Sequence, residues 1–211
     1  MKKNNATIGL ILYSIHSASG NVIMLSLVYV LVGIIAIISG DRILVSASVG
    51  IGVLCVSNAI LISSPKDANS KWNKLRLALP VKRSNIITSQ YLSHLLMLLY
   101  SIVLISIILF LCSLRHESLT SEYLFSLFTA NIGASLLGCA IFYPLAYTIG
   151  ENREEGLSVI AMLGGAGLGI TYWSAISSLE FFNNALFFAP IVVLFILSYC
   201  LTAKIYSQKD I

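Results

Sequence analysis

Long apolar stretches dominate this sequence and limit what it can fold into. Six of them lie between short polar connections, at 20–39, 43–63, 90–113, 122–149, 157–178 and 185–203. A helix needs roughly 20 apolar residues to cross the hydrocarbon core of a bilayer, and each stretch is about that long. Only 10% of the residues are charged, whereas soluble domains average about 25%. The sequence therefore predicts a polytopic membrane protein.

The predicted fold is all-α, because backbone groups cannot stay unpaired in lipid and no strand-like alternation of a membrane barrel is present. No long polar segment is left that could fold separately, so we expect residues 1–211 to form a single transmembrane domain. Six transmembrane helices, an interfacial elbow helix near the N-terminus and a helix in one cytoplasmic loop make up this prediction.

Lysine and arginine indicate the orientation of the spans. With the N-terminus inside, eleven of the 13 basic residues face the cytoplasm. Only Arg42 and Arg115 face outward. Basic residues concentrate on the cytoplasmic side of membrane proteins. We therefore expect a multi-pass protein of the cell membrane with both termini in the cytoplasm.

Residues 1–19 have two interpretations. Lys2 and Lys3 before a short apolar run, followed by Ser17-Ala18-Ser19, are similar to a signal peptide with its cleavage site. Cleavage would place the basic loop that follows the second stretch outside, against the charge distribution. The favoured interpretation is an interfacial elbow helix over 6–18, because apolar residues recur there at helical spacing.

The loop 64–89 is the one sizeable cytoplasmic connection and is predicted to contain a helix over 66–79. Ser64 is a suitable N-cap, Pro65 suits the first helical position, and Pro80 ends the helix. Trp72, Leu75 and Leu79 share one face, with Lys71, Lys74 and Arg76 around it. Such a helix either lies on anionic lipid headgroups or docks a soluble partner through Trp72 as its anchor.

No catalytic apparatus is evident in the sequence. A phosphate-binding loop of the G-x-x-x-x-G-K-[ST] type is absent. His116-Glu117 begins like a zinc-protease motif, but Thr120 stands where the second histidine belongs. His94 on an apolar helix favours a packed histidine over a metal ligand, and the four cysteines form no C-x-x-C pair. We expect neither an enzyme nor a metal site.

The glycine-rich stretch 164–169 lies within a predicted span. Gly165 and Gly169 have the G-x-x-x-G spacing that lets two helix backbones approach closely. Packing inside one bundle is the favoured interpretation, and packing against a second copy of the chain is the alternative.

One segment resembles a known family. Leu79-Pro80-Val81-Lys82-Arg83-Ser84-Asn85-Ile86-Ile87, followed by Ser89-Gln90-Tyr91-Leu92, is similar to the cytoplasmic loop of type 2 ATP-binding-cassette (ABC) exporter permeases. Within that family it resembles the small permeases of phenol-soluble-modulin and peptide-antibiotic exporters. The turn at 150–153 and the tail at 206–210 agree with this resemblance.

The resemblance implies a transporter subunit that works with two copies of a separate ATPase subunit and with a second permease, as a homodimer or heterodimer. ATP and Mg would be bound by the ATPase partner and not by this chain. The cargo would be amphipathic peptides or other hydrophobic molecules, and no nucleic acid is expected as a partner. The implied ATPase contacts are Lys71, Trp72, Lys74, Leu75, Arg76, Leu79, Pro80 and Arg83.

A different class remains open from the residues alone. A membrane scaffold or immunity protein that binds a partner through loop 64–89, without transport, would carry the same spans and the same basic loop.

Overall fold

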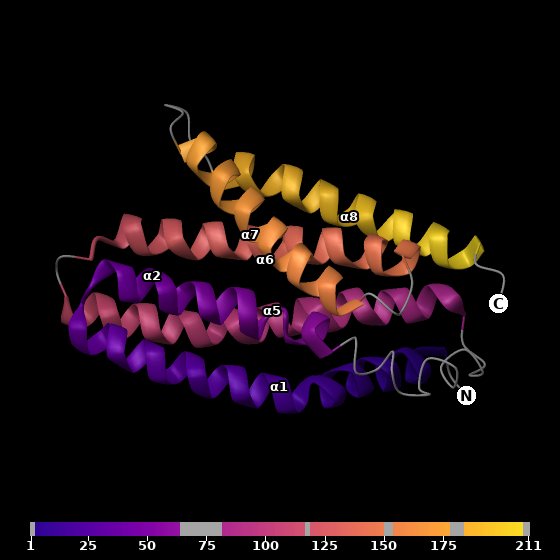
Figure 1. Ribbon diagram of the computed structural model, residues 1–211, viewed down its shortest axis with the longest axis horizontal. Coiled ribbons are helices and arrows are strands. Elements are labelled where there is room, and N and C mark those ends of the chain that lie inside the picture. Colours follow the sequence, from indigo (N-terminus) through magenta and orange to yellow (C-terminus); the bar gives the residue numbers. More distant parts are fainter. Residues whose placement is uncertain (1–2, 64–81, 117–118, 150–153, 178–183, 209–211) are drawn as a thin grey trace.

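The computed structural model describes residues 3–63, 82–116, 119–149, 154–177 and 184–208, and within these ranges the chain forms helices and no strand (Figure 1). The elements are α1 (Lys3–Ser39), α2 (Arg42–Gly50), η1 (Ile51–Val56), α5 (Arg83–Arg115), α6 (Ser121–Ile149), α7 (Glu154–Ser177) and α8 (Asn184–Gln208). An all-α fold is therefore confirmed for the described part of the chain.

Five described helices are long and apolar enough to cross a membrane: α1, α5, α6, α7 and α8. They cover the first and the last four predicted spans. Each helix contains its apolar run almost entirely, because lipid demands an unbroken hydrogen-bonded backbone over the whole length of the run, and α1 and α5 begin well before theirs.

The second predicted span, 43–63, is not one regular helix. It consists of α2, the π-helical segment η1, a turn at 57–58 and a further helical piece at 59–63. A Cβ atom built at Gly52 would lie 2.8 Å from the Tyr29 ring and 2.8 Å from Ile105. The backbone of η1 thus passes very close to α1 and α5. Five of the six predicted spans are thus long helices, and the second is a divided segment.

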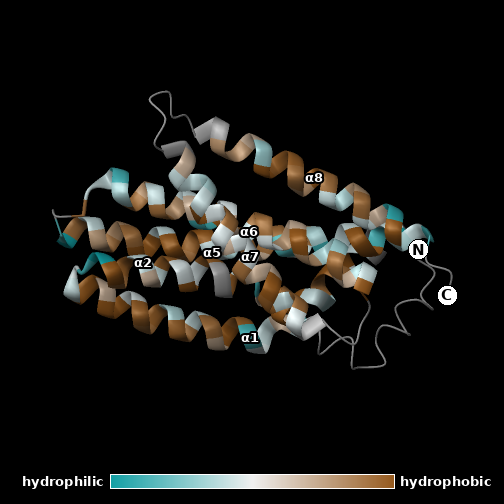
Figure 2. Cartoon of the chain, turned by 45° about the horizontal axis from the view of Figure 1, so that its top comes forward, coloured by the Kyte–Doolittle hydropathy of each residue, from teal (hydrophilic) through white to brown (hydrophobic). Residues whose placement is uncertain are grey.

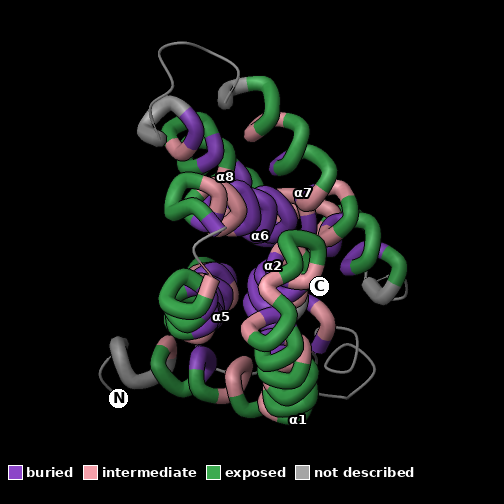
Figure 3. The backbone as a smooth tube through the Cα atoms, turned by 90° about the vertical axis from the view of Figure 1, so that its left-hand side faces the viewer, coloured by how far each residue is buried: buried purple, intermediate pink, exposed green. Residues whose placement is uncertain are grey.

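Helix α1 also differs from the prediction of a separate elbow over 6–18. It is a single helix of 37 residues, without a break before the expected start of the first span. Figure 3 shows that it is bent: its N-terminal part runs across the view while the rest is seen nearly end-on. The change of direction is thus made within one continuous helix.

The helices pack in two groups around α6 (Figure 3). Helix α1 packs against α2 and α5, while α6 packs against α7 and α8. In α6, 56% of the span is buried inside the bundle, against 17% in α1 and in α8. Helix α6 is therefore the centre of the bundle, and α1 and α8 are its most exposed members.

The outer surface of the bundle is apolar along its length (Figure 2). Leu114 and Leu163 are each 69% exposed, and Phe110 is 62% exposed. Such a surface would drive association in water, but in hydrocarbon it matches the solvent. The exposed leucines support a lipid-facing surface.

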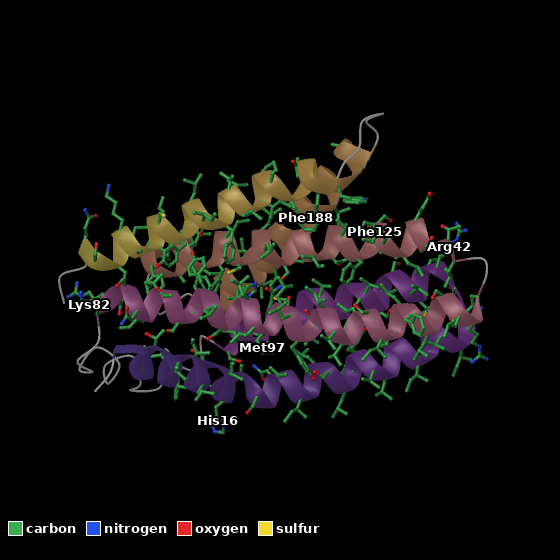
Figure 4. The ribbon with its side chains drawn as sticks, turned by 180° about the vertical axis from the view of Figure 1, so that it is seen from behind. His16, Arg42, Lys82, Met97, Phe125 and Phe188 are labelled. Carbon is green, nitrogen blue, oxygen red and sulfur yellow. The ribbon has the colours of Figure 1, made fainter. Side chains whose placement is uncertain are left out.

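The ends of the bundle are arranged as an even number of crossings requires. The start of α1 and the end of α8 lie at the same end (Figure 1). Lys82, just before α5, and Arg42, at the start of α2, lie at opposite ends (Figure 4). Following the orientation that the basic residues predict, we refer to the end with Lys82 as the inner end and to the end with Arg42 as the outer end.

Candidate functional site

The predicted ATPase contact ends at Arg83, where α5 begins. Seven of its eight residues, Lys71, Trp72, Lys74, Leu75, Arg76, Leu79 and Pro80, lie outside the described residues, as does the predicted helix 66–79. Arg83 is described: it is the first residue of α5 and is exposed. Its Nη1 donates a hydrogen bond to the Ser207 carbonyl at 3.3 Å, at the end of α8.

Further along α5, hydroxyl groups continue this connection to α8. The Thr88 hydroxyl lies 2.9 Å from the Tyr199 hydroxyl. The Tyr91 hydroxyl lies 2.8 Å from Ser198 Oγ and 3.0 Å from Thr202 Oγ1. These contacts follow one face of α5, because residues three and four apart share a face of a helix.

Gln90 connects α5 to α6 on the adjacent face. The Tyr143 hydroxyl donates to the Gln90 carbonyl at 3.2 Å, and the Tyr147 hydroxyl donates to the Gln90 side-chain oxygen. Helix α8 is connected to α6 as well, since Ser198 Oγ donates to the Ala140 carbonyl at 2.7 Å. The inner ends of α5, α6 and α8 are therefore joined pairwise by hydrogen bonds.

Aromatic rings fill the space between these hydrogen bonds. The Tyr91 ring is 4% exposed. Its centroid lies 4.6 Å from that of Tyr143, 5.3 Å from that of Phe195 and 5.4 Å from that of Tyr199. The last two pairs are edge-to-face, a favourable geometry for aromatic rings. We call the residues Gln90, Tyr91, Tyr143, Tyr147, Ser198, Tyr199 and Thr202 the inner cluster.

Deeper in the bundle, polar side chains line the break in the second segment. Ser57, next to η1, bonds the Val53 carbonyl and lies 2.6 Å from Ser135 Oγ of α6. His94 of α5 is fully buried, and neither ring nitrogen has a hydrogen-bond partner among the described residues, although the Ser135 backbone faces the ring. The described residues contain no group of three or more side chains that could hold a metal ion.

Gly165 and Gly169 lie against α6 of the same chain. A Cβ built at Gly165 would lie 2.5 Å from the Gly138 amide nitrogen, and one at Gly169 would lie 2.8 Å from the Ala134 Cα. The structure thus uses the G-x-x-x-G spacing for packing within one bundle. This is the favoured interpretation of the spacing, so we do not assign these glycines to an interface with a second copy.

At the outer end, three contacts hold the α1–α2 turn. His116 Nε2 donates to the Ile37 carbonyl at 2.8 Å. Arg42 lies 5.6 Å from the centroid of the Tyr123 ring, and the Tyr123 hydroxyl donates to the Arg42 carbonyl at 3.2 Å. His116, which begins the apparent zinc-protease motif, is therefore part of a helix connection.

Together, the long apolar helices, their exposed apolar surface and their buried polar connections define a multi-pass α-helical membrane protein. A sequence model described as "ABC-2 family transporter protein" matches residues 9–207. Because this match covers nearly the whole chain, the protein belongs to the ABC-2 family of transporter proteins. No curated protein sequence and no solved structure shows a significant match to the chain.

Sequence reasoning found the inner cluster only in part. Gln90 and Tyr91 belong to the segment that carries the family resemblance, but their partners on α6 and α8 do not. Tyr91 and Thr202, for example, are 111 positions apart. The repeated tyrosines at 143, 147 and 199 were the available signal, because a tyrosine in a span must place its hydroxyl against a polar partner.

Proposed function

We propose that this chain is the membrane-spanning permease subunit of an ABC exporter. The observation that carries the proposal is the ABC-2 family match over residues 9–207. A separate ATPase subunit binds ATP and Mg and hydrolyses the ATP. The absence of a phosphate-binding loop in the sequence supports this division of labour.

The ATPase subunit docks at the inner end, on the segment from Lys71 to Arg83. Trp72 serves as the buried anchor, with Lys71, Lys74 and Arg76 as its charged rim and with Leu79 and Pro80 setting where the helix ends. The support from the described residues is the position of Arg83, which is exposed at the start of α5 and bonded to the end of α8. A partner that moves this segment acts directly on two membrane-spanning helices.

The assembled transporter contains two permeases and two ATPase subunits in the cell membrane, with both termini of each permease in the cytoplasm. The eleven-to-two distribution of basic residues supports this orientation. So does the placement of both terminal helix ends at the end of the bundle that carries Lys82.

The cargo is an amphipathic peptide, in the manner of phenol-soluble modulins or peptide antibiotics, or another hydrophobic molecule. The predicted apolar spans contain no charged residue in their interiors, and a pathway for ions or a chain of proton carriers requires such residues. The polar groups within the spans are mainly hydroxyls and amides, which suit a cargo that carries few charges.

A test of ATPase docking also separates this proposal from the scaffold or immunity alternative. Tagged permease is purified in detergent from its native host, and ATP hydrolysis is measured in the recovered complex. Trp72→Ala is expected to cost about 2 kcal/mol or more of ATPase binding, as buried anchors do, and thus to deplete the recovered ATPase. Lys71→Glu and Arg76→Glu should have smaller effects, because rim charges are screened by salt.

Trp173→Ala is the matched control, since Trp173 is the other tryptophan of the chain. Trp173 lies on α7 and packs edge-on against Phe187 of α8. It should leave the ATPase bound. Equal recovery of the ATPase with wild type and Trp72→Ala would refute the docking role. Recovery of no ATPase with wild type would favour the scaffold or immunity alternative.

A further inference from the structure

The hydrogen bonds of the inner cluster run in one direction through three helices. Ser198 Oγ donates its single proton to the Ala140 carbonyl. It can therefore only accept from Tyr91, so the Tyr91 hydroxyl donates to Ser198. The result is a chain from Tyr91 of α5 through Ser198 of α8 to the Ala140 backbone of α6.

These bonds are confined to one end of the α5–α8 pair. The hydrogen bonds that the structure describes between these two helices all involve 83–91 of α5 and 198–207 of α8. Toward the outer end, α8 diverges from α5 (Figures 1 and 4). There the ring of Phe187 packs against Tyr172 and Trp173 of α7 instead.

The contact of α5 with α1 is different in kind. It consists largely of apolar side chains, among them Tyr29, Ile105 and Ile108. The described hydrogen bonds across it are long: 3.4 Å from Ser26 to Tyr100 and 3.4 Å from Tyr29 to the Leu104 carbonyl. Packing holds helices together in lipid, and an interhelical hydrogen bond adds to it one specific partner atom that an apolar contact does not require.

We propose that Tyr91 is a positioning residue of the transport cycle. Its hydroxyl joins the inner halves of α5, α6 and α8 into one unit, so that a displacement at the start of α5 moves α8 while α1 slides against the unit. Helix α8 is one continuous helix that leaves α5 toward the outer end. A movement of the inner end of α8 therefore displaces the outer end of α8 as well. This inference rests on the proposed function, which supplies the partner that moves the start of α5.

The test uses the complete complex with its copurified ATPase subunit, reconstituted in lipid nanodiscs. Spin labels on keto amino acids at Ile38 of α1 and Val192 of α8, which are 61% and 45% exposed, report the distance between the two helices. ATP with vanadate should shift this distance in wild type. Tyr91→Phe, which keeps the ring and removes the hydroxyl, should reduce the shift at least twofold while ATP hydrolysis stays within twofold of wild type.

Tyr100→Phe is the matched control on the same helix, because the described hydroxyl contact of Tyr100 is the long one to Ser26. It should leave the shift unchanged. Ser198→Ala on α8 is the second variant: it removes the acceptor of the Tyr91 proton together with the bond to the Ala140 carbonyl, and it should also reduce the shift. It can be assayed even if Tyr91→Phe does not fold.

A rescue separates positioning from a general effect on stability. In the Tyr91→Phe protein, with Cys55, Cys112, Cys139 and Cys200 replaced by alanine, Thr88→Cys and Tyr199→Cys are joined by a short bifunctional thiol reagent. The cross-link should restore the shift, since it rejoins α5 to α8 where their hydroxyls lie 2.9 Å apart.

An unchanged shift in both Tyr91→Phe and Ser198→Ala, or no restoration by the cross-link, would overturn the inference. A wild-type complex that binds an ATPase and hydrolyses ATP but shows no shift would overturn it as well. Failure of the proposed function is a distinct result, because wild type would then recover no ATPase activity at all.

Discussion

Gly165 of α7 and Gly138 of α6 meet backbone to backbone, with no room for a side chain between them. A Cβ at Gly165 would come within 2.7 Å of the Ala134 carbonyl oxygen as well as meeting the Gly138 backbone. Two helices can approach this closely only where both present small residues. The contact fixes α7 against α6, the most buried of the long helices.

Gly165→Ala should therefore destabilise the fold, because backbone atoms of α6 cannot move aside as a flexible side chain could. We expect a loss on the order of 1–3 kcal/mol, as for other overpacked cores, measured as a lower midpoint of thermal unfolding in detergent. Gly167→Ala, two positions away, is the control. It is exposed with nothing within 4 Å of its added Cβ, so its midpoint should stay unchanged or rise. Equal midpoints for the two variants would contradict the packing of α7 on α6.

Gly40 and His116 form a comparable pair at the outer end. Gly40 has a φ of 65°, in the left-handed region that costs other residues about 1–2 kcal/mol. A Cβ there would also lie 2.5 Å from the His116 ring. Gly40→Ala should thus lower the unfolding midpoint through both backbone strain and a clash.

A double-mutant cycle separates these two contributions. His116→Ala alone loses the hydrogen bond to the Ile37 carbonyl. In the Gly40→Ala/His116→Ala protein the clash is gone, while the backbone strain and the loss of the hydrogen bond remain. The combined loss should therefore be smaller than the sum of the single losses. Strict additivity would show that the two residues do not touch.

The orientation of the bundle predicts a clear labelling result. Ser121 and Ser84 are exposed serines near the starts of α6 and α5. In a cysteine-free background, a membrane-impermeant thiol reagent added to intact cells should label Ser121→Cys and not Ser84→Cys. Permeabilised cells are the control, in which both should react. The opposite pattern in intact cells would invert the orientation and remove the proposed ATPase site from the cytoplasm.

The long helices could be predicted from sequence because lipid enforces a simple rule on them. For α6, the predicted span 122–149 agrees with Ser121–Ile149 almost residue for residue. The rule is local: an uncharged apolar run of sufficient length pairs its backbone groups within itself by forming helix.

The divided second segment could not be predicted in the same way, because its cause is not local. The run 43–63 is as apolar as its neighbours, and the π-helical turn occurs where Gly52 passes between Tyr29 and Ile105. These contacts come from helices distant in sequence. The inner cluster has the same limitation: the resemblance segment contains Tyr91, but its position gives no information on Ser198, 107 residues later.

His94 provides a test of how a membrane bundle treats a buried polar side chain. It is 0% exposed, and its ring nitrogens make no hydrogen bond within the described residues. An unsatisfied buried polar group costs stability, and replacing it with an apolar group of similar shape is neutral or favourable. His94→Leu should accordingly keep the wild-type unfolding midpoint or raise it.

His116→Leu is the matched control, since His116 donates a 2.8 Å hydrogen bond to the Ile37 carbonyl. The unfolding midpoint of His116→Leu should fall by an amount equivalent to about 1 kcal/mol. If His94→Leu proved the more damaging of the two, the His94 ring would have to make a stabilising polar contact, and the Ser135 backbone that faces it would be the first group to examine.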